Sequence, residues 1–276
     1  MQIVEIDSPD DPRIADYRDV RDAQKRDAEG LFLVEGRLNV KRLLCSQFVA
    51  RSVFVSRPAL VALDAALQRC TGPVFVAEPA LLKRVVGYDM HRGCLAAAER
   101  RRVEPLATAL ERERGTRGSQ LWVAIEGVAN PENVGGIFRN ALAFGAGRLV
   151  LGPRCADPLY RKSVRVSMGA ALRVPFVTGP GGSATVQQLR DAGFFVVALS
   201  TSRDAMPLEA CSPPSQRVAL LLGSEAEGLP PQVLAAADAR VTIPMAPGID
   251  SLNAATAAGI ALHQFARELG RLAGTP

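Results

Sequence analysis

The chain has 276 residues, 48% of them hydrophobic, so it can bury a substantial core, and we expect one domain of about 150 residues plus a smaller one. The net charge of +5 rests almost wholly on arginine, which favours bidentate phosphate recognition and makes RNA a natural partner. The five cysteines form no CxxC pair and there are only two histidines, which excludes a zinc-type cluster and predicts free thiols in a reducing cytoplasm. No export signal or apolar run of about 18 residues is present, so we expect a soluble, unexported protein without membrane attachment.

Residues 1–98 alternate short apolar runs with stretches of helical periodicity, the pattern of a small α/β domain. The predicted strands cover 31–34, 52–55, 74–77 and 94–97, and the predicted helices cover 38–44 and 60–67. A charged, glycine-containing stretch without a strand pattern follows at 99–119 and predicts a linker.

From residue 120 onward, continuous apolar runs recur in the manner of buried parallel strands, with helical stretches between them. The runs cover 121–125, 148–151, 194–199, 218–222 and 240–243. The last helix is predicted over Ser251–Leu269, with Ser251 placed to cap it. The predicted fold class is therefore α/β, with a parallel-sheet domain over residues 120–276.

Three turns of special composition follow strands of this predicted sheet, at the edge where ligands of open α/β sheets bind. They are Asn130–Arg139, Leu222–Leu229 and Ile243–Asn253. The first places Asn133, Gly135, Gly136 and Arg139 at a strand-to-helix turn, where open backbone N–H groups suit a ligand that carries phosphate. Each residue also has an ordinary structural interpretation as a turn glycine, a helix cap or a surface side chain. Their co-occurrence indicates an enzyme, and the absence of GxxxxGK[ST] or a strand-borne GxGxxG disfavours P-loop NTPases and nicotinamide dehydrogenases.

The three turns, in this order and spacing and together with the segment 162–170, resemble the SpoU (TrmH-type) family of RNA ribose 2′-O-methyltransferases over about residues 121–269. The resemblance implies an α/β fold whose C-terminal segment is threaded into a deep trefoil knot, which general topology rules argue against. It also implies that the knot forms an S-adenosylmethionine pocket and part of a homodimer interface. The third turn departs from the commonest family pattern, because Pro247 stands where glycine is frequent and Gly248 follows it.

Carried over position by position, the resemblance implies the site residues. The catalytic candidates are Arg139, Asn133, Glu225, Ser251 and Asn253, the cofactor contacts are Leu199, Gly223, Ile243 and Leu252, and no metal site is suggested. Arg139 takes the position of the family's central catalytic arginine. Because a guanidinium stays protonated under ordinary conditions, a phosphate clamp that stabilises the developing alkoxide is the more conservative role for it than a general base. Glu225 is a candidate for positioning Arg139 or receiving the proton.

The N-terminal region is similar to the substrate-binding domain of many family members, a small α/β unit related to a ribosomal-protein RNA-binding fold. The predicted RNA-binding residues are Arg18, Arg21, Lys41 and Arg42 in this region and Arg165 in the later connecting segment. A second RNA-contacting surface suits a large structured target, so ribosomal RNA is favoured over transfer RNA.

The resemblance thus implies a dimeric, cytoplasmic enzyme that uses S-adenosylmethionine to methylate a ribose 2′-hydroxyl of RNA. Two alternatives stay open, namely a transfer RNA 2′-O-methyltransferase and a non-catalytic RNA-binding ribosome-assembly factor with the same fold. Methylation of a base by a related knotted enzyme would predict different residues at the three turns.

Overall fold

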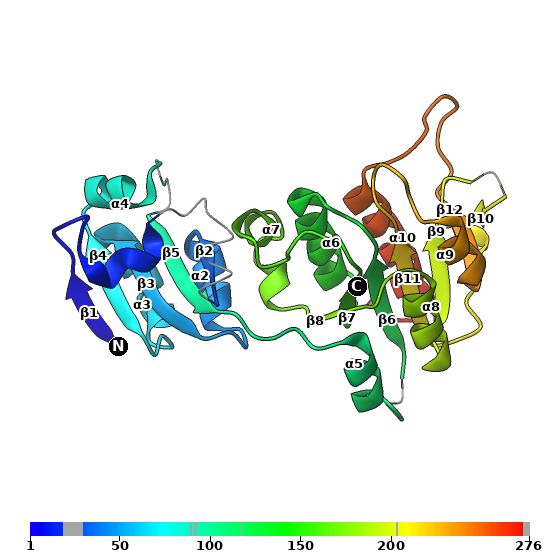
Figure 1. Cartoon of the computed structure of the whole chain (residues 1–276), viewed down its shortest axis with the longest axis horizontal. Helices are drawn as coiled ribbons and strands as arrows, with labels where there is room; N and C mark the ends of the chain where they lie inside the picture. Colours follow the sequence, from blue (N-terminus) through cyan, green and yellow to red (C-terminus); the bar gives the residue numbers. More distant parts are fainter. Residues whose placement is uncertain (19–29, 89, 91–92, 117, 203, 273–276) are drawn as a thin grey trace. The chain divides into compact units, whose positions relative to one another are not determined.

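The computed structural model describes residues 1–18, 30–88, 90, 93–116, 118–202 and 204–272 (Figure 1). These residues form two compact units, each with its own sheet. One unit combines Met1–Arg102 with Leu159–Arg173, and the other combines Val103–Pro158 with Val174–Pro276. This division differs from the predicted boundaries, because residues 159–173 join the first unit and because the predicted linker contains a helix.

The first unit is built on a five-stranded mixed sheet with the order β1-β4-β3-β5-β2. Its strands are β1 (Gln2–Glu5), β2 (Leu31–Glu35), β3 (Ala50–Ser56), β4 (Pro73–Ala77) and β5 (Cys94–Glu99). β4 is parallel to β1 and β3, while β5 is antiparallel to β2 and β3. Its helices are η1 (Pro12–Tyr17), α2 (Arg37–Leu44), α3 (Arg57–Leu67), α4 (Pro79–Val86), α7 (Arg161–Val166) and η2 (Ala170–Leu172). The four predicted strands and two predicted helices are confirmed, and β1 and α4 are additions.

The core of the first unit encloses one tyrosine that ties η1 to the sheet. Tyr17 is fully buried, its hydroxyl lies 2.7 Å from Ser52 Oγ, and it accepts a 3.3 Å hydrogen bond from the amide of Ala97. Burial raises the pKa of the Tyr17 phenol above its usual range, so the hydroxyl stays neutral. The tilted ring of Phe54 lies 5.2 Å away between centroids.

Residues 159–173 are held on the first unit by arginines that bond across large sequence distances. Arg161, the first residue of α7, forms a 3.0 Å ion pair with Glu35 and stacks over the ring of Tyr88 at 5.0 Å. From the other direction, Arg42 donates a hydrogen bond to the carbonyl of Met168. These contacts join residues that are far apart in the sequence, and no local sequence pattern predicts them. The sequence therefore predicted residues 159–173 as part of the downstream domain.

The second unit contains a seven-stranded sheet in which every strand pair is parallel, with the order β10-β12-β9-β11-β6-β7-β8. The strands are β6 (Gln120–Ile125), β7 (Arg148–Leu151), β8 (Phe176–Thr178), β9 (Phe195–Leu199), β10 (Met206–Pro207), β11 (Arg217–Leu222) and β12 (Ala239–Thr242). The five predicted strands are confirmed within one residue at each end. β8 and β10, at the two edges, are too short to leave an apolar run in the sequence.

Helices cover both faces of this sheet, as side-chain alternation along buried strands requires. Buried residues of α5 (Leu106–Arg112), α8 (Gly182–Asp191) and α9 (Pro231–Ala236) pack in one cluster with Trp122, Val150 and Leu221 of the strands. α6 (Pro131–Ala143) and α10 (Ala254–Glu268) pack on each other, and α10 also contacts β11. A short helix, η3 (Leu208–Ala210), follows β10.

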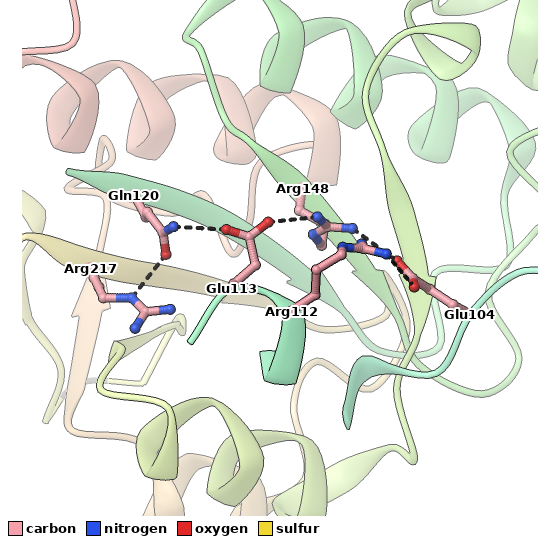
Figure 2. Close-up of polar contacts among 6 residues, drawn as sticks. All are labelled: Glu104, Arg112, Glu113, Gln120, Arg148 and Arg217. Atoms are coloured by element: carbon pink, nitrogen blue, oxygen red, sulfur yellow. Dashed lines mark hydrogen bonds and ion pairs between the residues drawn. The ribbon is translucent and has the colours of Figure 1, made fainter. Parts of the chain in front are cut away.

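Buried and half-buried charges lie at the amino ends of β6, β7 and β11, opposite the edge that carries the three special turns (Figure 2). Arg148 bonds Glu104 at 3.4 Å and Glu113 at 2.9 Å, and it stacks over Trp122. The chain of contacts continues from Glu113 through Gln120 to Arg217, and Arg112 pairs with Glu104 at 2.6 Å. Because Glu104, Arg112 and Glu113 lie within or beside α5, these contacts fasten the predicted linker to the sheet.

The described part of the chain has no helix with the combined length and apolar character of a membrane span. Within the same residues, no group of three or more His, Cys, Asp or Glu side chains is arranged to hold a metal ion. All five cysteines are free thiols.

The Glu104 carboxylate predicts an acid-sensitive contribution to stability. Hydrogen bonds from Arg112, together with the charges of Arg112 and Arg148, lower the pKa of Glu104 below its ordinary value of 4.5. The unfolded chain therefore takes up this proton first as the pH falls, so the stabilisation is complete above the unfolded pKa and is lost as the pH falls through the folded pKa. The free energy of unfolding of Glu104→Gln should differ from that of the wild type by a constant amount near neutral pH, and by a shrinking amount in acid. Denaturant melts at several pH values measure this, and a difference that is constant into strong acid contradicts it.

Candidate active site

The amide of Asn133 joins the three special turns of the second unit. Its Nδ2 donates a hydrogen bond to Glu225 Oε1 in the turn after β11. Its Oδ1 accepts a 2.8 Å hydrogen bond from Nδ2 of Asn253, the residue that ends the third turn. Asn133 itself is 6% exposed, and both polar ends of this buried amide have a partner, while Glu225 and Asn253 are exposed. The structure therefore brings together three of the predicted catalytic residues, with Asn133 bonded to two residues that lie 92 and 120 positions away in the chain.

Asparagine caps define the starts of both helices at this site. Asn253 Oδ1 accepts from the amides of Ala255 and Thr256 at 3.0 and 3.2 Å, so Asn253 is the N-cap of α10. The expectation that Ser251 caps this helix is wrong, because the Asn253 side chain already satisfies the first-turn amides two residues later. Ser251 lies exposed in the third turn.

The first turn is also shorter than the sequence analysis expected. Asn130 caps α6 by accepting a 2.9 Å hydrogen bond from the amide of Glu132, and Pro131 begins the helix. Asn133, Gly135, Gly136 and Arg139 consequently lie inside α6 and not in an open turn. The expectation of a phosphate cradle is wrong for the backbone amides of Gly135, Gly136 and Arg139, which lie beyond the first turn of the helix. In a helix, amides beyond the first turn are bonded to carbonyls of the preceding turn.

Small residues let α6 and α10 approach closely beside the asparagines. A Cβ atom at Gly136 would lie 2.6 Å from the Cβ of Ala255, and one at Gly259 would lie 3.0 Å from Nδ2 of Asn140. Asn140 uses the same Nδ2 to donate a 2.6 Å hydrogen bond to the carbonyl of Ala255. Asn140 is not among the site residues predicted from the sequence, although its position seven residues after Asn133 places the two on one helix face.

Backbone contacts close the second turn on itself. Gly228 has a φ of +66°, its amide donates a 3.0 Å hydrogen bond to the carbonyl of Ser224, and these two residues form an isolated antiparallel bridge. A side chain at Gly223 would overlap the carbonyl group of Gly228. Both glycines are therefore required by the turn, which presents the exposed Glu225 at its tip.

A cavity of about 710 Å³ lies between the second and third turns and the end of β9. All four predicted cofactor contacts, Leu199, Gly223, Ile243 and Leu252, line it. Glu225, Ser251 and Asn253 line it as well, so its wall combines polar and apolar side chains. The volume and the mixture of surfaces are typical of a small-molecule site, and its place beyond the carboxyl ends of β9, β11 and β12 is where open α/β sheets bind ligands.

Arg139 is the predicted catalytic residue that the structure leaves apart from this cluster. It lies exposed in the third turn of α6, and within the described ranges its guanidinium makes no hydrogen bond or ion pair. A guanidinium without a protein partner keeps all of its donors for a bound anion.

The predicted RNA-binding residues have different surroundings. Arg18 donates hydrogen bonds to the carbonyls of Pro9 and Asp11 at 3.1 and 2.7 Å, and Arg42 is bonded to Met168. Both side chains are therefore engaged by backbone carbonyls of the protein itself. Lys41 on α2 and Arg165 on α7 are exposed, and Arg21 lies outside the described residues.

Comparison with known proteins gives four informative matches. A model of the SpoU rRNA Methylase family matches residues 120–263. An uncharacterized tRNA/rRNA methyltransferase of Mycobacterium bovis is 38% identical over 273 residues, which cover 97% of this chain and 93% of that protein. The 23S rRNA (guanosine-2′-O-)-methyltransferase RlmB of Ralstonia nicotianae is 31% identical over 193 residues, covering 68% of this chain and 74% of its own length. The crystal structure of an AdoMet-bound rRNA methyltransferase from Sinorhizobium meliloti has a TM-score of 0.82 at 27% identity, covering 97% of this chain and 98% of that chain.

The close approach of α6 and α10 predicts that Gly136 tolerates no side chain. Alanine raises helix propensity over glycine by about 1 kcal/mol, so Gly136→Ala would stabilise an isolated α6. In this fold the added methyl group meets the Ala255 Cβ, and we expect the free energy of unfolding to fall by about 1–3 kcal/mol. Chemical denaturation measures the change. Gly147→Ala is the matched control, because a Cβ there lies 3.8 Å from Trp122 Nε1 and should be tolerated; equal stability of the two variants would contradict the tight packing.

Proposed function

This chain belongs to the SpoU rRNA methylase family, and we propose that it transfers a methyl group from S-adenosylmethionine to a ribose 2′-hydroxyl of RNA. The observation that carries this proposal is the hydrogen-bonded chain from Asn253 through Asn133 to Glu225, which lies beside a cavity lined by all four predicted cofactor contacts. The relatives agree in class, since one is named as a methyltransferase of a guanosine 2′-oxygen in 23S rRNA and another is an rRNA methyltransferase with AdoMet bound.

The cavity residues fit S-adenosylmethionine in chemistry and in size. Leu199, Ile243 and Leu252 supply apolar surface for an adenine ring, and the turn that begins at Gly223 supplies backbone groups for the polar edges of a nucleoside. When bound, this cofactor supplies a methyl group on a sulfonium that is already electrophilic. The protein's contribution is then to place the 2′-oxygen in line and to help remove its proton.

The side chains around Asn133 divide this work. Asn133 fixes the Glu225 carboxylate by donating to Oε1, and Asn253 fixes Asn133, so Glu225 is held at the mouth of the cavity. There it is placed to position a substrate hydroxyl or to take its proton. Arg139 supplies a free guanidinium for the phosphate next to the target ribose and for the developing negative charge on oxygen. Ser251, exposed on the cavity wall, provides a further hydroxyl for the substrate.

We propose the finer features of the family as well. Residues 243–253 join β12, which lies beyond β9, to α10, which packs on α6, and such a return path supports the deep trefoil knot. Ile260, 41% exposed on α10, supports a homodimer. The five free thiols support a cytoplasmic location, and the relative that acts on 23S rRNA supports ribosomal over transfer RNA.

The deciding experiment incubates the purified protein with methyl-labelled S-adenosylmethionine and RNA transcribed in vitro, which carries no methyl groups. Ribosomal and transfer RNA are tested separately, and the digested nucleosides are analysed for 2′-O-methyl products. Label in a 2′-O-methylnucleoside from ribosomal RNA confirms the proposal. Label in a 2′-O-methylnucleoside from transfer RNA alone would mean that the substrate is transfer RNA and not ribosomal RNA. Label on a base would contradict methylation of the ribose. RNA binding without any transfer favours a non-catalytic assembly factor.

The exposed position of Arg139 predicts a variant that separates catalysis from cofactor binding. Arg139→Ala should reduce methyl transfer at least about 100-fold, because it removes the cation that faces the developing alkoxide. Affinity for S-adenosylmethionine should stay within about twofold, since Arg139 is not among the residues that line the cavity. Arg139→Lys keeps the charge but loses the planar guanidinium, so its rate of methyl transfer should lie between those of the wild type and Arg139→Ala. Single-turnover transfer and calorimetric titration with the cofactor measure the two effects, and near-normal transfer by Arg139→Ala removes Arg139 from the mechanism.

A further inference from the structure

A second arginine, Arg154, is held in an unusual backbone conformation beside the candidate active site. It follows β7, and its φ of +63° makes it one of two described non-glycine residues with a positive φ. Left-handed backbone costs an arginine about 1 kcal/mol or more, and it persists only where the surroundings impose it. Here the surroundings are two backbone hydrogen bonds of 2.8 Å that flank Arg154, from Gly152 to the carbonyl of Ile125 and from Ala156 to the carbonyl of Val128.

These two bonds fasten the Arg154 turn to the segment that leads from β6 into α6. Between them, Glu126 accepts a 3.0 Å hydrogen bond from the amide of Gly182, and a side chain at Gly152 would overlap its carboxylate. The nearby carboxylate is therefore already engaged by backbone. The turn is thus held in place by backbone hydrogen bonds, and the Glu126 carboxylate does not pair with the charge of Arg154.

The guanidinium of Arg154 lies against Gly127, next to the second turn of the active site. A Cβ atom at Gly127 would stand 3.9 Å from Arg154 Nη2 and 3.5 Å from Ser224 Cβ. Arg154 and Ser224, the neighbour of Glu225, therefore flank one face of Gly127. Within the described ranges the guanidinium of Arg154 has no hydrogen bond and no ion pair, and the residue is exposed.

From this placement we propose that Arg154 is a positioning residue that binds a phosphodiester of the substrate RNA close to the target ribose. The inference rests on the proposed function of the same site. A planar, permanently charged fork with all donors free is suited to phosphate oxygens. The carboxylate of the cofactor is the other anion available here. Among the described residues, Arg154 is not one of those that line the cavity, so a phosphate of the RNA is favoured over the carboxylate of the cofactor as its anion.

The test compares Arg154→Ala, Arg154→Lys and Arg154→Gly with the wild type in the full-length protein. The probe is 23S ribosomal RNA transcribed in vitro, and its affinity and KM are measured over a range of salt concentrations. Arg154→Ala should weaken RNA binding and raise KM about tenfold, with kcat and the affinity for S-adenosylmethionine changed less than about twofold. The log–log salt dependence of RNA binding should become shallower by about 1, and Arg154→Lys should recover part of the affinity.

Two controls separate this role from folding and from bulk charge. Arg154→Gly removes the side chain from a backbone that glycine adopts freely, so it should keep the fold and match Arg154→Ala in RNA binding. Arg114→Ala removes the same charge at a side chain that is 79% exposed and precedes the amino end of β6, and it should change RNA affinity less than about twofold. Equal effects of Arg114→Ala and Arg154→Ala overturn the inference, and so does an equal loss of cofactor affinity. If the wild-type protein methylates no RNA, the proposed function fails, while loss of RNA binding by the variants still decides the role of Arg154.

Discussion

One amide side chain couples the three turns on which this site depends. Asn133 must donate to Glu225 and accept from Asn253 at the same time, and a primary amide on a short stem does both. An aspartate would place an acceptor oxygen against the Glu225 carboxylate, and an alanine would leave Asn253 Nδ2 and Glu225 Oε1 without this partner. Because Asn253 also caps α10, the bonds of one side chain fix a carboxylate, a helix start and a cavity wall together.

This coupling requires α6 and α10 to lie unusually close. Gly136 and Gly259 remove the side chains that would separate the helices, and Asn140 bonds the Ala255 carbonyl across the contact. At the far end of the same sheet, Arg148 anchors α5 through Glu104 and Glu113. Burying an arginine is costly unless its charge is paired, and Arg148 has two carboxylate partners. These ion pairs lie at the end of the sheet opposite the cavity. The edge with the three turns is then free to hold polar groups for a ligand.

The sequence predicted the parts of this architecture that have a local signature. Continuous apolar runs predicted the five central strands, and the family resemblance implied four cofactor contacts, all of which line the cavity. The failures have physical causes. Ser251 and Asn253 are both good helix caps, and the choice between them depends on Asn133, 120 residues away. The helix α5 is too short and too charged to show a clear period, and its anchorage comes from β7. The docking of residues 159–173 on the first unit rests on arginine contacts across 126 residues.

The number of arginines therefore does not locate an RNA-binding surface. The hydrogen-bond partners of each arginine distinguish those that stabilise the fold from those that are available to bind an anion. Arg18, Arg42, Arg148 and Arg217 each donate hydrogen bonds to carbonyls, carboxylates or side-chain amides of the protein itself, so these arginines contribute to the fold. In the described part of the second unit, Arg139 and Arg154 keep theirs free, and both follow strands at the edge that carries the cavity. A guanidinium that makes no contact within the fold, at the edge of the sheet that carries the cavity, is the feature on which the proposed substrate contacts rest.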